Sequence, residues 1–188
     1  MLKKIALALG AVLLALVAVV AMQPSSFVIE RSAAIDAPPG VAYRHIENLR
    51  AWEAWNPWQK LDPELKSSYA GPEAGVGATS SWEGPNAGKG RMTIGAVKPD
   101  QEVEIELEFL APVAATNRAL FTLTPAQGAT RVTWRMEGRN GFVAKALGLV
   151  MDMDQMVGGE FEKGLASLKA LAEADARKRA ASAPGNEG

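Results

Sequence analysis

The sequence predicts an α+β domain in which a curved antiparallel sheet of about seven strands is covered by one long C-terminal helix. Three observations lead to this prediction. An uncharged apolar segment opens the chain, apolar and polar residues alternate along most of its middle, and a helical apolar period follows near its end. An antiparallel sheet buries one face, and the C-terminal helix is the only predicted element large enough to cover it. We therefore expect an apolar hollow where a curved sheet and a straight helix separate.

Residues 1–22 are expected to be a transmembrane anchor or a signal sequence rather than part of the core. Lys3 and Lys4 precede 18 uncharged residues, Ile5 to Met22, which as a helix would span roughly 27 Å, close to the thickness of a hydrocarbon core. The length favours a retained anchor, and a signal cleaved near Ala21 is the alternative. Because the next basic residue is Arg31, we expect a single-pass membrane protein whose soluble domain lies on the periplasmic or extracellular side.

The soluble domain is expected to cover residues 27–172. Its clearest strand runs over residues 102–109, where valine, isoleucine, leucine and phenylalanine alternate with four glutamates. Pro57 rules out one straight helix over residues 50–61, so we expect a short helical turn followed by a loop there. In chain order we expect a strand over 27–35, a short helix over 40–49, that turn, and then strands over 67–70, 78–83, 90–97, 102–109, 116–124 and 130–138.

The C-terminal helix is predicted from two apolar stretches. Phe161, Leu165, Leu168 and Ala172 recur at helical spacing, and residues 142–157 upstream are rich in leucine and methionine. The pair Gly158-Gly159 between them predicts a bend or a close backbone approach. Residues 173–188 carry little that is apolar and larger than alanine, so we expect them to fray into a disordered tail.

Composition excludes several kinds of site. Lys and Arg total 20 and Asp and Glu total 21, a formal net charge of −1, which argues against a nucleic-acid partner. The chain has no cysteine and one histidine, so disulfides, zinc–thiolate sites, thiol nucleophiles and any site with two imidazoles are excluded within one chain. We predict neither a metal nor a cofactor.

Large apolar side chains are the predicted ligand-binding residues. Methionine adapts to irregular partners and tryptophan combines a large apolar surface with one polar N–H. Ordinary core filling is the alternative, and the pair Trp55 and Trp58 is also interpreted as a plug at one end of the sheet. The predicted set is Trp55, Trp58, Trp82, Met92, Phe109, Trp134, Met136, Met151 and Met156.

No catalytic set is predicted. An acid–base role would fall to His45, Tyr43, Tyr69 or Asp152, although an exposed or capping histidine is the simpler interpretation of His45. The carboxylates Asp152, Asp154, Glu160 and Glu162, and the glutamates of residues 102–108, are interpreted as solvated faces.

Short motifs spread over nearly the whole domain resemble those of one known superfamily. They are Phe27-Val28-Ile29-Glu30-Arg31, Ile35-Asp36-Ala37-Pro38, Trp55-Asn56-Pro57-Trp58, Asp62-Pro63, Tyr69-Ala70-Gly71, Gly75-Val76-Gly77-Ala78, Trp82-Glu83-Gly84, Gly88-Lys89-Gly90-Arg91-Met92, Thr130-Arg131-Val132-Thr133-Trp134 and Phe161-Glu162-Lys163-Gly164-Leu165. In order and spacing the chain resembles the START-like (SRPBCC) superfamily, and more closely its polyketide cyclase/dehydrase and lipid-transport branch in a membrane-anchored form. The resemblance implies a helix-grip fold and a pocket for an apolar or amphipathic small molecule, without implying one reaction.

Three functions follow as hypotheses. The first is membrane-tethered binding of a lipid or other hydrophobic small molecule between sheet and helix. The second is a cyclase- or dehydrase-like enzyme acting on a polyketide or aromatic substrate, which needs acid–base groups inside the hollow. The third is a protein-interaction module whose hollow is filled by side chains.

Overall fold

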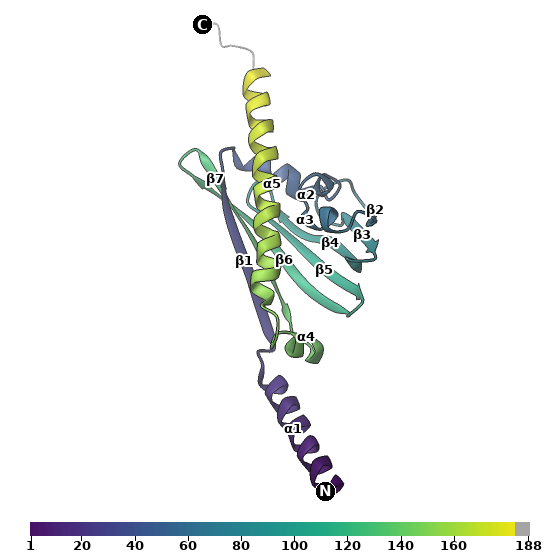
Figure 1. The fold of residues 1–188 in the computed structure, drawn as a ribbon. Coiled ribbons are helices and arrows are strands. Elements are labelled where there is room, and N and C mark those ends of the chain that lie inside the picture. The colour runs from purple at the N-terminus through teal and green to yellow at the C-terminus, as the bar shows by residue number, and fades with distance from the viewer. Residues whose placement is uncertain (183–188) are drawn as a thin grey trace, which may run out of the picture.

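The computed structural model describes residues 1–182, so the part of the predicted tail over residues 183–188 lies outside the described residues. The chain starts with the apolar helix α1 (Leu2–Met22) and continues into strand β1 (Ser26–Ile35). The short helices α2 (Pro39–Glu47), η1 (Ala51–Ala54, a 3₁₀ helix) and α3 (Pro57–Leu61) follow. After the remaining strands, the chain ends in α4 (Phe142–Leu147) and the long helix α5 (Met153–Ser182) (Figure 1).

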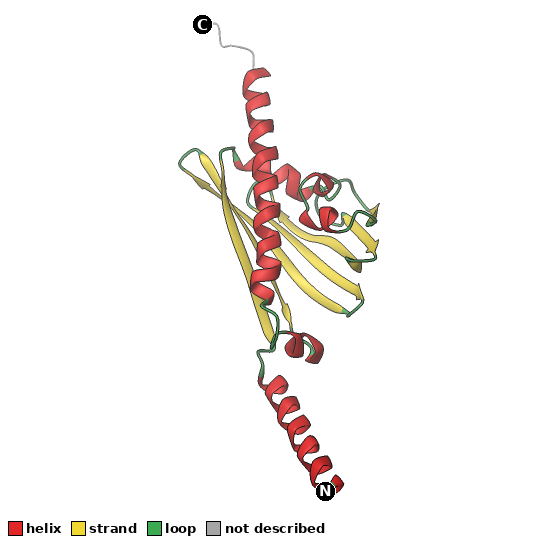
Figure 2. Cartoon of the chain, viewed as in Figure 1, coloured by secondary structure: helices red, strands yellow, loops and turns green. Residues whose placement is uncertain are grey.

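Seven antiparallel strands form one open sheet, which confirms the predicted α+β fold and places each strand within two residues of its expected bounds. The strand order is β1-β7-β6-β5-β4-β3-β2, so only β1 departs from a simple meander. The six strands that follow α3 are β2 (Lys66–Ala70), β3 (Thr79–Gly84), β4 (Gly88–Lys98), β5 (Glu102–Ala111), β6 (Ala115–Ala126) and β7 (Ala129–Arg139). Figure 2 shows the sheet twisting behind the single long helix.

The sheet bends at β4. The pairing register between β4 and β5 shifts between Lys89 and Gly90 and again between Ile94 and Ala96. An extra residue in one strand of an antiparallel pair kinks that strand and increases its twist. Both irregularities lie in the half of the sheet formed by β3, β4 and β5, away from the β1 edge on which α5 packs.

Helix α5 packs on the sheet through one apolar stripe. Phe161, Leu165, Leu168 and Ala172 are each 0–1% exposed, as their spacing predicted. The Phe161 ring stacks on the Trp134 ring of β7 with centroids 4.1 Å apart and planes 5° apart. Gly164 allows this approach, because a Cβ there would lie 2.9 Å from Trp134 and 3.1 Å from Pro57.

The opposite face of the sheet is charged, as the alternation of residues predicted. Arg118 on β6 bridges Glu104 on β5 at 2.6 Å and Glu137 on β7 at 3.3 Å. Arg135 reaches Glu137 at 3.2 Å and Glu30 at 3.3 Å. These hydrogen bonds hold the pKa values of Glu104 and Glu137 below their ordinary range.

One prediction about the helices is wrong, and another is met in the second of its two expected forms. The predicted single helix over 142–157 is broken at residues 148–152, where Asp152 Oδ1 accepts a hydrogen bond from the Gln155 backbone N–H and so caps α5. Gly158-Gly159 does not bend α5. A Cβ on Gly158 would instead lie 2.2 Å from the Arg31 guanidinium, so this residue provides the close approach that was the other predicted outcome.

Two further segments are more helical than expected. Residues 57–61 form helix α3 instead of a loop, because Asn56 caps it by accepting from the Trp58 N–H and proline suits its first turn. At the C-terminal end, α5 continues beyond the expected domain boundary at Ala172 to Ser182.

Candidate ligand-binding cavity

A cavity of about 1010 Å³ lies between the sheet and the helices. Its floor is the concave face of the sheet, where the side chains of alternate residues face the same way. The apolar floor residues on the strands are Phe27, Ile29, Met92, Ile105, Leu107, Phe109, Ala119, Trp134 and Met136. Residues of η1, α3, β2 and β3 form one wall, and the segment from α4 to the start of α5 forms another.

The cavity has this volume because α5 covers only part of the floor. Helix α5 contacts β1 far more than any other strand, and β1 lies at one edge of the sheet. The floor residues on β4 and β5 lie toward the other side of the sheet, away from the strand that α5 contacts most. The expected separation of a curved sheet from a straight helix is therefore present in the structure.

An aromatic cluster closes one side of the cavity. Trp134 contacts the rings of Trp52, Trp55, Trp58 and Phe121 with centroid distances between 4.9 and 5.9 Å. Most of these pairs meet edge to face, the favoured arrangement for aromatic rings in protein cores. The rings of this cluster pack against one another. Trp52, Trp58 and Trp134 reach the cavity, whereas Trp55 and Phe121 do not.

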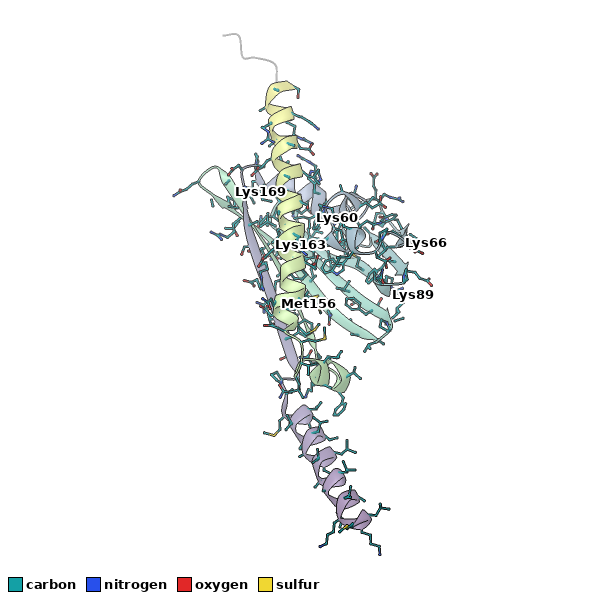
Figure 3. All side chains as sticks on the ribbon, in the orientation of Figure 1. Lys60, Lys66, Lys89, Met156, Lys163 and Lys169 are labelled. Atoms are coloured by element: carbon teal, nitrogen blue, oxygen red, sulfur yellow. The ribbon has the colours of Figure 1, made fainter. Side chains whose placement is uncertain are left out.

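Most of the predicted ligand-binding residues come together on this cavity. Seven of the nine line it: Trp58, Trp82, Met92, Phe109, Trp134, Met136 and Met151. Trp55 does not, because it is fully buried below the cluster and its indole N–H donates to the His45 carbonyl at 3.1 Å. This position matches the plug interpretation of Trp55. Met156 is 47% exposed on α5 and also lies outside the lining (Figure 3).

Glycines make room for the aromatic side chains of the cavity. A Cβ on Gly90 would lie 2.2 Å from the Trp82 ring, so Gly90 lets this indole lie flat against β4. The Trp82 ring meets Phe109 of β5 edge to face at 5.8 Å. The indole N–H of Trp82 donates to the Ala87 carbonyl, which fixes the ring at the wall.

The lining has two polar features that the sequence did not predict. The first is a contact between Tyr69 and Glu53. Tyr69 on β2 donates its hydroxyl to Glu53 Oε1 on η1 at 2.6 Å, and the Arg50 guanidinium lies 4.5 Å from the centre of the Tyr69 ring. Burial, and then Glu53, raises the pKa of Tyr69 to about 12, so the phenol keeps its proton at neutral pH. The two residues are 16 positions apart in sequence, and only the fold brings them together.

Asn117 is the second polar feature. It is 9% exposed and lines the cavity on β6, and its Oδ1 has no hydrogen-bond partner among residues 1–182. The alternation with Ala119 and Phe121 along the same strand was the signal that places it on the inner face. The amide is a polar group in a mainly apolar lining.

The other acid–base candidates do not gather in the cavity. His45 Nε2 lies 3.0 Å from Asp175 Oδ2 of α5, outside the lining. Tyr43 is buried outside the lining, and its pKa is raised to about 12 by burial and then by Glu47. Asp152 lines the cavity but is exposed and serves as a helix cap.

The interpretation of the acidic residues of α5 as a merely solvated face is incomplete. Asp154 and Glu162 accept hydrogen bonds from the Arg31 side chain of β1 at 2.9 and 2.8 Å. The pKa of Asp154 is lowered by this contact. Within residues 1–182 no three His, Cys, Asp or Glu side chains gather closely enough to hold a metal ion.

A seven-stranded antiparallel sheet that closes around a long C-terminal helix and leaves an apolar cavity defines the helix-grip class of ligand-binding folds. The sequence agrees with this class, because the family described as "Polyketide cyclase / dehydrase and lipid transport" matches residues 26–173. The chain belongs to this family. Its N-terminal helix α1, which precedes the matched region, is long and apolar enough to span a membrane.

Solved structures share the fold at low sequence identity. Protein CV1439 from Chromobacterium violaceum is similar with a TM-score of 0.57 at 18% identity, covering 78% of this chain and 96% of that one. Aha1 from Colwellia psychrerythraea, solved as a dimer, gives 0.56 at 17% identity over 78% and 96% of the two chains. A hypothetical protein from Helicobacter pylori gives 0.60 at 10% identity over 78% and 88%. A comparison with curated proteins found no match.

Proposed function

We propose that this protein binds a lipid or other hydrophobic small molecule in the cavity while α1 tethers it to a membrane. The observation that carries the proposal is the cavity of about 1010 Å³ with an apolar, methionine- and tryptophan-rich floor. This volume is at the upper end of the range of roughly 300–1,000 Å³ that is typical of small-molecule pockets. The family, whose description includes lipid transport, supports the same class of ligand.

The polar lining favours an amphipathic ligand over a pure hydrocarbon. The Asn117 side chain, whose Oδ1 is packed against Gly138, adds an amide to the lining beside the apolar floor. The Tyr69–Glu53 pair lies at another part of the same lining. Both features are consistent with a molecule that has an apolar body and a polar end.

The tether and its orientation belong to the same proposal. Lys3 and Lys4 lie in the first turn of α1, ahead of its uncharged part, so the amino terminus would stay inside and the domain would lie on the periplasmic or extracellular side. A tether of this kind would keep the cavity beside the bilayer, where apolar molecules concentrate.

Native mass spectrometry of the full chain, released from detergent micelles, tests ligand binding. We expect bound masses in the range of a lipid or similar amphiphile, and their loss in Ala119→Phe, which fills the floor. Ala96→Phe makes the same substitution at an exposed position of β4 and is the matched control that keeps the bound mass. Wild-type protein without any bound mass, even after incubation with extracted lipids, would count against the proposal.

A cyclase- or dehydrase-like reaction is the second candidate, and one observation favours it. Tyr69 and Glu53 form a hydrogen-bonded pair on the cavity wall, which is the only acid–base pair there within residues 1–182. Tyr69→Phe would remove the proton donor and leave the ring. Loss of turnover with unchanged ligand binding would support an enzyme, and unchanged turnover would exclude Tyr69 as its acid.

A further inference from the structure

An apolar rim projects from the end of the domain nearest α1. We define the apolar rim as α4 together with residues 148–153. Eight of the thirteen exposed large apolar side chains that residues 23–182 carry lie between Phe142 and Met156. Val150 is 80% exposed, Phe142 is 55% exposed and Val143 is 52% exposed. A concentration of this kind marks an interaction surface.

The rim sits directly beside the end of α1. Lys145 Nζ of α4 donates to the Ala21 carbonyl at 3.3 Å and to Ser25 Oγ at 2.9 Å. Figure 1 shows α4 at the end of the sheet from which α1 leaves, whereas the β6–β7 hairpin lies at the opposite end. If α1 spans a bilayer, its last residue Met22 lies near one surface, and the rim then faces that same surface.

The same residues form a wall of the cavity. Leu147, Val150 and Met151 line it, and each is at least 42% exposed. Gln23 and Pro24, the residues that follow α1, line it as well. The apolar side chains that line the cavity nearest α1 therefore belong to the same segment as Phe142 and Val143, which are exposed and lie outside the lining.

We propose that the apolar rim docks on the lipid bilayer that α1 crosses, so that an apolar ligand passes between bilayer and cavity without entering water. The inference rests on the proposed function and names the source of the ligand. The bilayer is favoured as the occupant because α1 is continuous with the rim through Lys145 and because the exposed rim residues are aliphatic and aromatic. Amphipathic elements bury such side chains at the boundary of headgroups and acyl chains.

A site-specific fluorophore tests the docking. The chain has no cysteine, so Val150→Cys introduces a single attachment site for an environment-sensitive dye in the full chain reconstituted into phosphatidylcholine–phosphatidylglycerol vesicles. Ala126→Cys places the same dye at the exposed end of β6, on the opposite end of the sheet. We expect a blue shift and strong quenching by spin-labelled lipid at residue 150, and neither at residue 126. Equal, weak quenching at both positions would overturn the docking.

A second variant separates this inference from the proposed function. Val143→Asp, at an exposed position of the rim outside the cavity lining, should slow the uptake of a fluorescent fatty acid from vesicles by about tenfold or more, since removing one valine from an apolar environment is worth roughly that factor. It should leave the bound mass seen by native mass spectrometry unchanged. A wild-type protein that shows no bound ligand in native mass spectrometry would reject ligand binding itself. Unchanged uptake in Val143→Asp with ligand bound would reject only the transfer route, as would a stable soluble dimer that buries the rim.

Discussion

Asp62 shows how one buried carboxylate organises the wall of the cavity. It is 1% exposed at the end of α3, and its Oδ2 accepts hydrogen bonds from the backbone N–H groups of Asn86 and Ala87 at 2.9 and 2.8 Å. Gly84 is required beside it, because a Cβ there would lie 2.4 Å from the carboxylate. Asp62 therefore fixes the β3–β4 turn, whose residues line the cavity.

Replacing Asp62 tests this role. Asp62→Ala leaves two backbone N–H groups without their acceptor and should lower the free energy of unfolding by about 2 kcal/mol. Asp62→Asn keeps one side-chain oxygen and should lose less than half of that. Urea unfolding of the full chain in detergent, followed by tryptophan fluorescence, measures both variants. Equal stability of Asp62→Ala and the wild type would show that the turn is held by other contacts.

The direction in which a side chain faces could be predicted where the side chain follows the period of its own element. Met92, Trp134 and Met136 reach the cavity as the alternation along their strands indicated. Trp55 and Met156 differ because each lies on a helix or turn whose rotation depends on packing against another element. The contact between Tyr69 and Glu53 joins two elements, so no local pattern contained it.

At the scale of single elements, α5 is positioned by the glycines on its inner side. Gly164 lies against Trp134 and Pro57, whereas no described atom outside its own helix turn lies within 4 Å of a Cβ on Gly159. The two residues therefore provide a matched pair within one helix.

Alanine at these two positions should act in opposite directions. Gly164→Ala forces a methyl group against a buried indole and should destabilise the protein by about 1–3 kcal/mol. Gly159→Ala should stabilise it by up to about 1 kcal/mol through helix propensity alone. Thermal unfolding of the two variants checks this. If Gly159→Ala destabilised the protein as much as Gly164→Ala, then the cost at Gly164 could not be attributed to its contact with Trp134.

The charged outer face of the sheet predicts acid sensitivity. The pKa values of Glu104 and Glu137 are lowered by hydrogen bonds, from Arg118 to Glu104 and from Arg135 and Arg118 to Glu137. A carboxylate whose pKa is lower in the folded state stabilises the fold above its unfolded pKa, near 4.5, and this contribution disappears as the pH falls through the folded pKa. Stability should thus decrease as the pH is lowered below about 4.5.

Arg118→Gln should make this decrease shallower, because it removes the partner that lowers the pKa of Glu104. Arg179→Gln, near the far end of α5, changes the net charge equally and is the control. The midpoint of urea unfolding, measured from neutral pH down to about pH 3, gives the comparison. The same slope in both variants would contradict the role assigned to Arg118.

The sheet was easier to predict than the helices for a physical reason. In residues 102–109 burial on one face imposes a strict alternation, and this pattern survives in the sequence. Residues 142–157 are mostly apolar because they form both a cavity wall and the exposed apolar rim, so no helical period marked the break between α4 and α5. Asp152 could have predicted the break, because aspartate is a preferred N-cap residue and here caps the start of α5.

At the scale of the whole molecule, the proposed function depends on the position of the cavity beside α1, the helix that is long and apolar enough to span a membrane. The family and the fold are established by the match over residues 26–173 and by the strand order. Ligand binding and the tether are proposals that these features support. The composition of the chain allowed both to be predicted, whereas the contact of α4 with α1 required the three-dimensional arrangement.

The most direct test of ligand binding uses the tryptophans of the chain. All five lie in or beside the cavity and none lies in α1, and Trp52, Trp58, Trp82 and Trp134 line the cavity itself. A fatty acid with a brominated acyl chain should therefore quench the fluorescence of the full chain saturably, and Ala119→Phe should abolish this effect while Ala96→Phe preserves it. Quenching that never saturates, or that is the same in all three proteins, would contradict the claim that the cavity accepts an apolar guest.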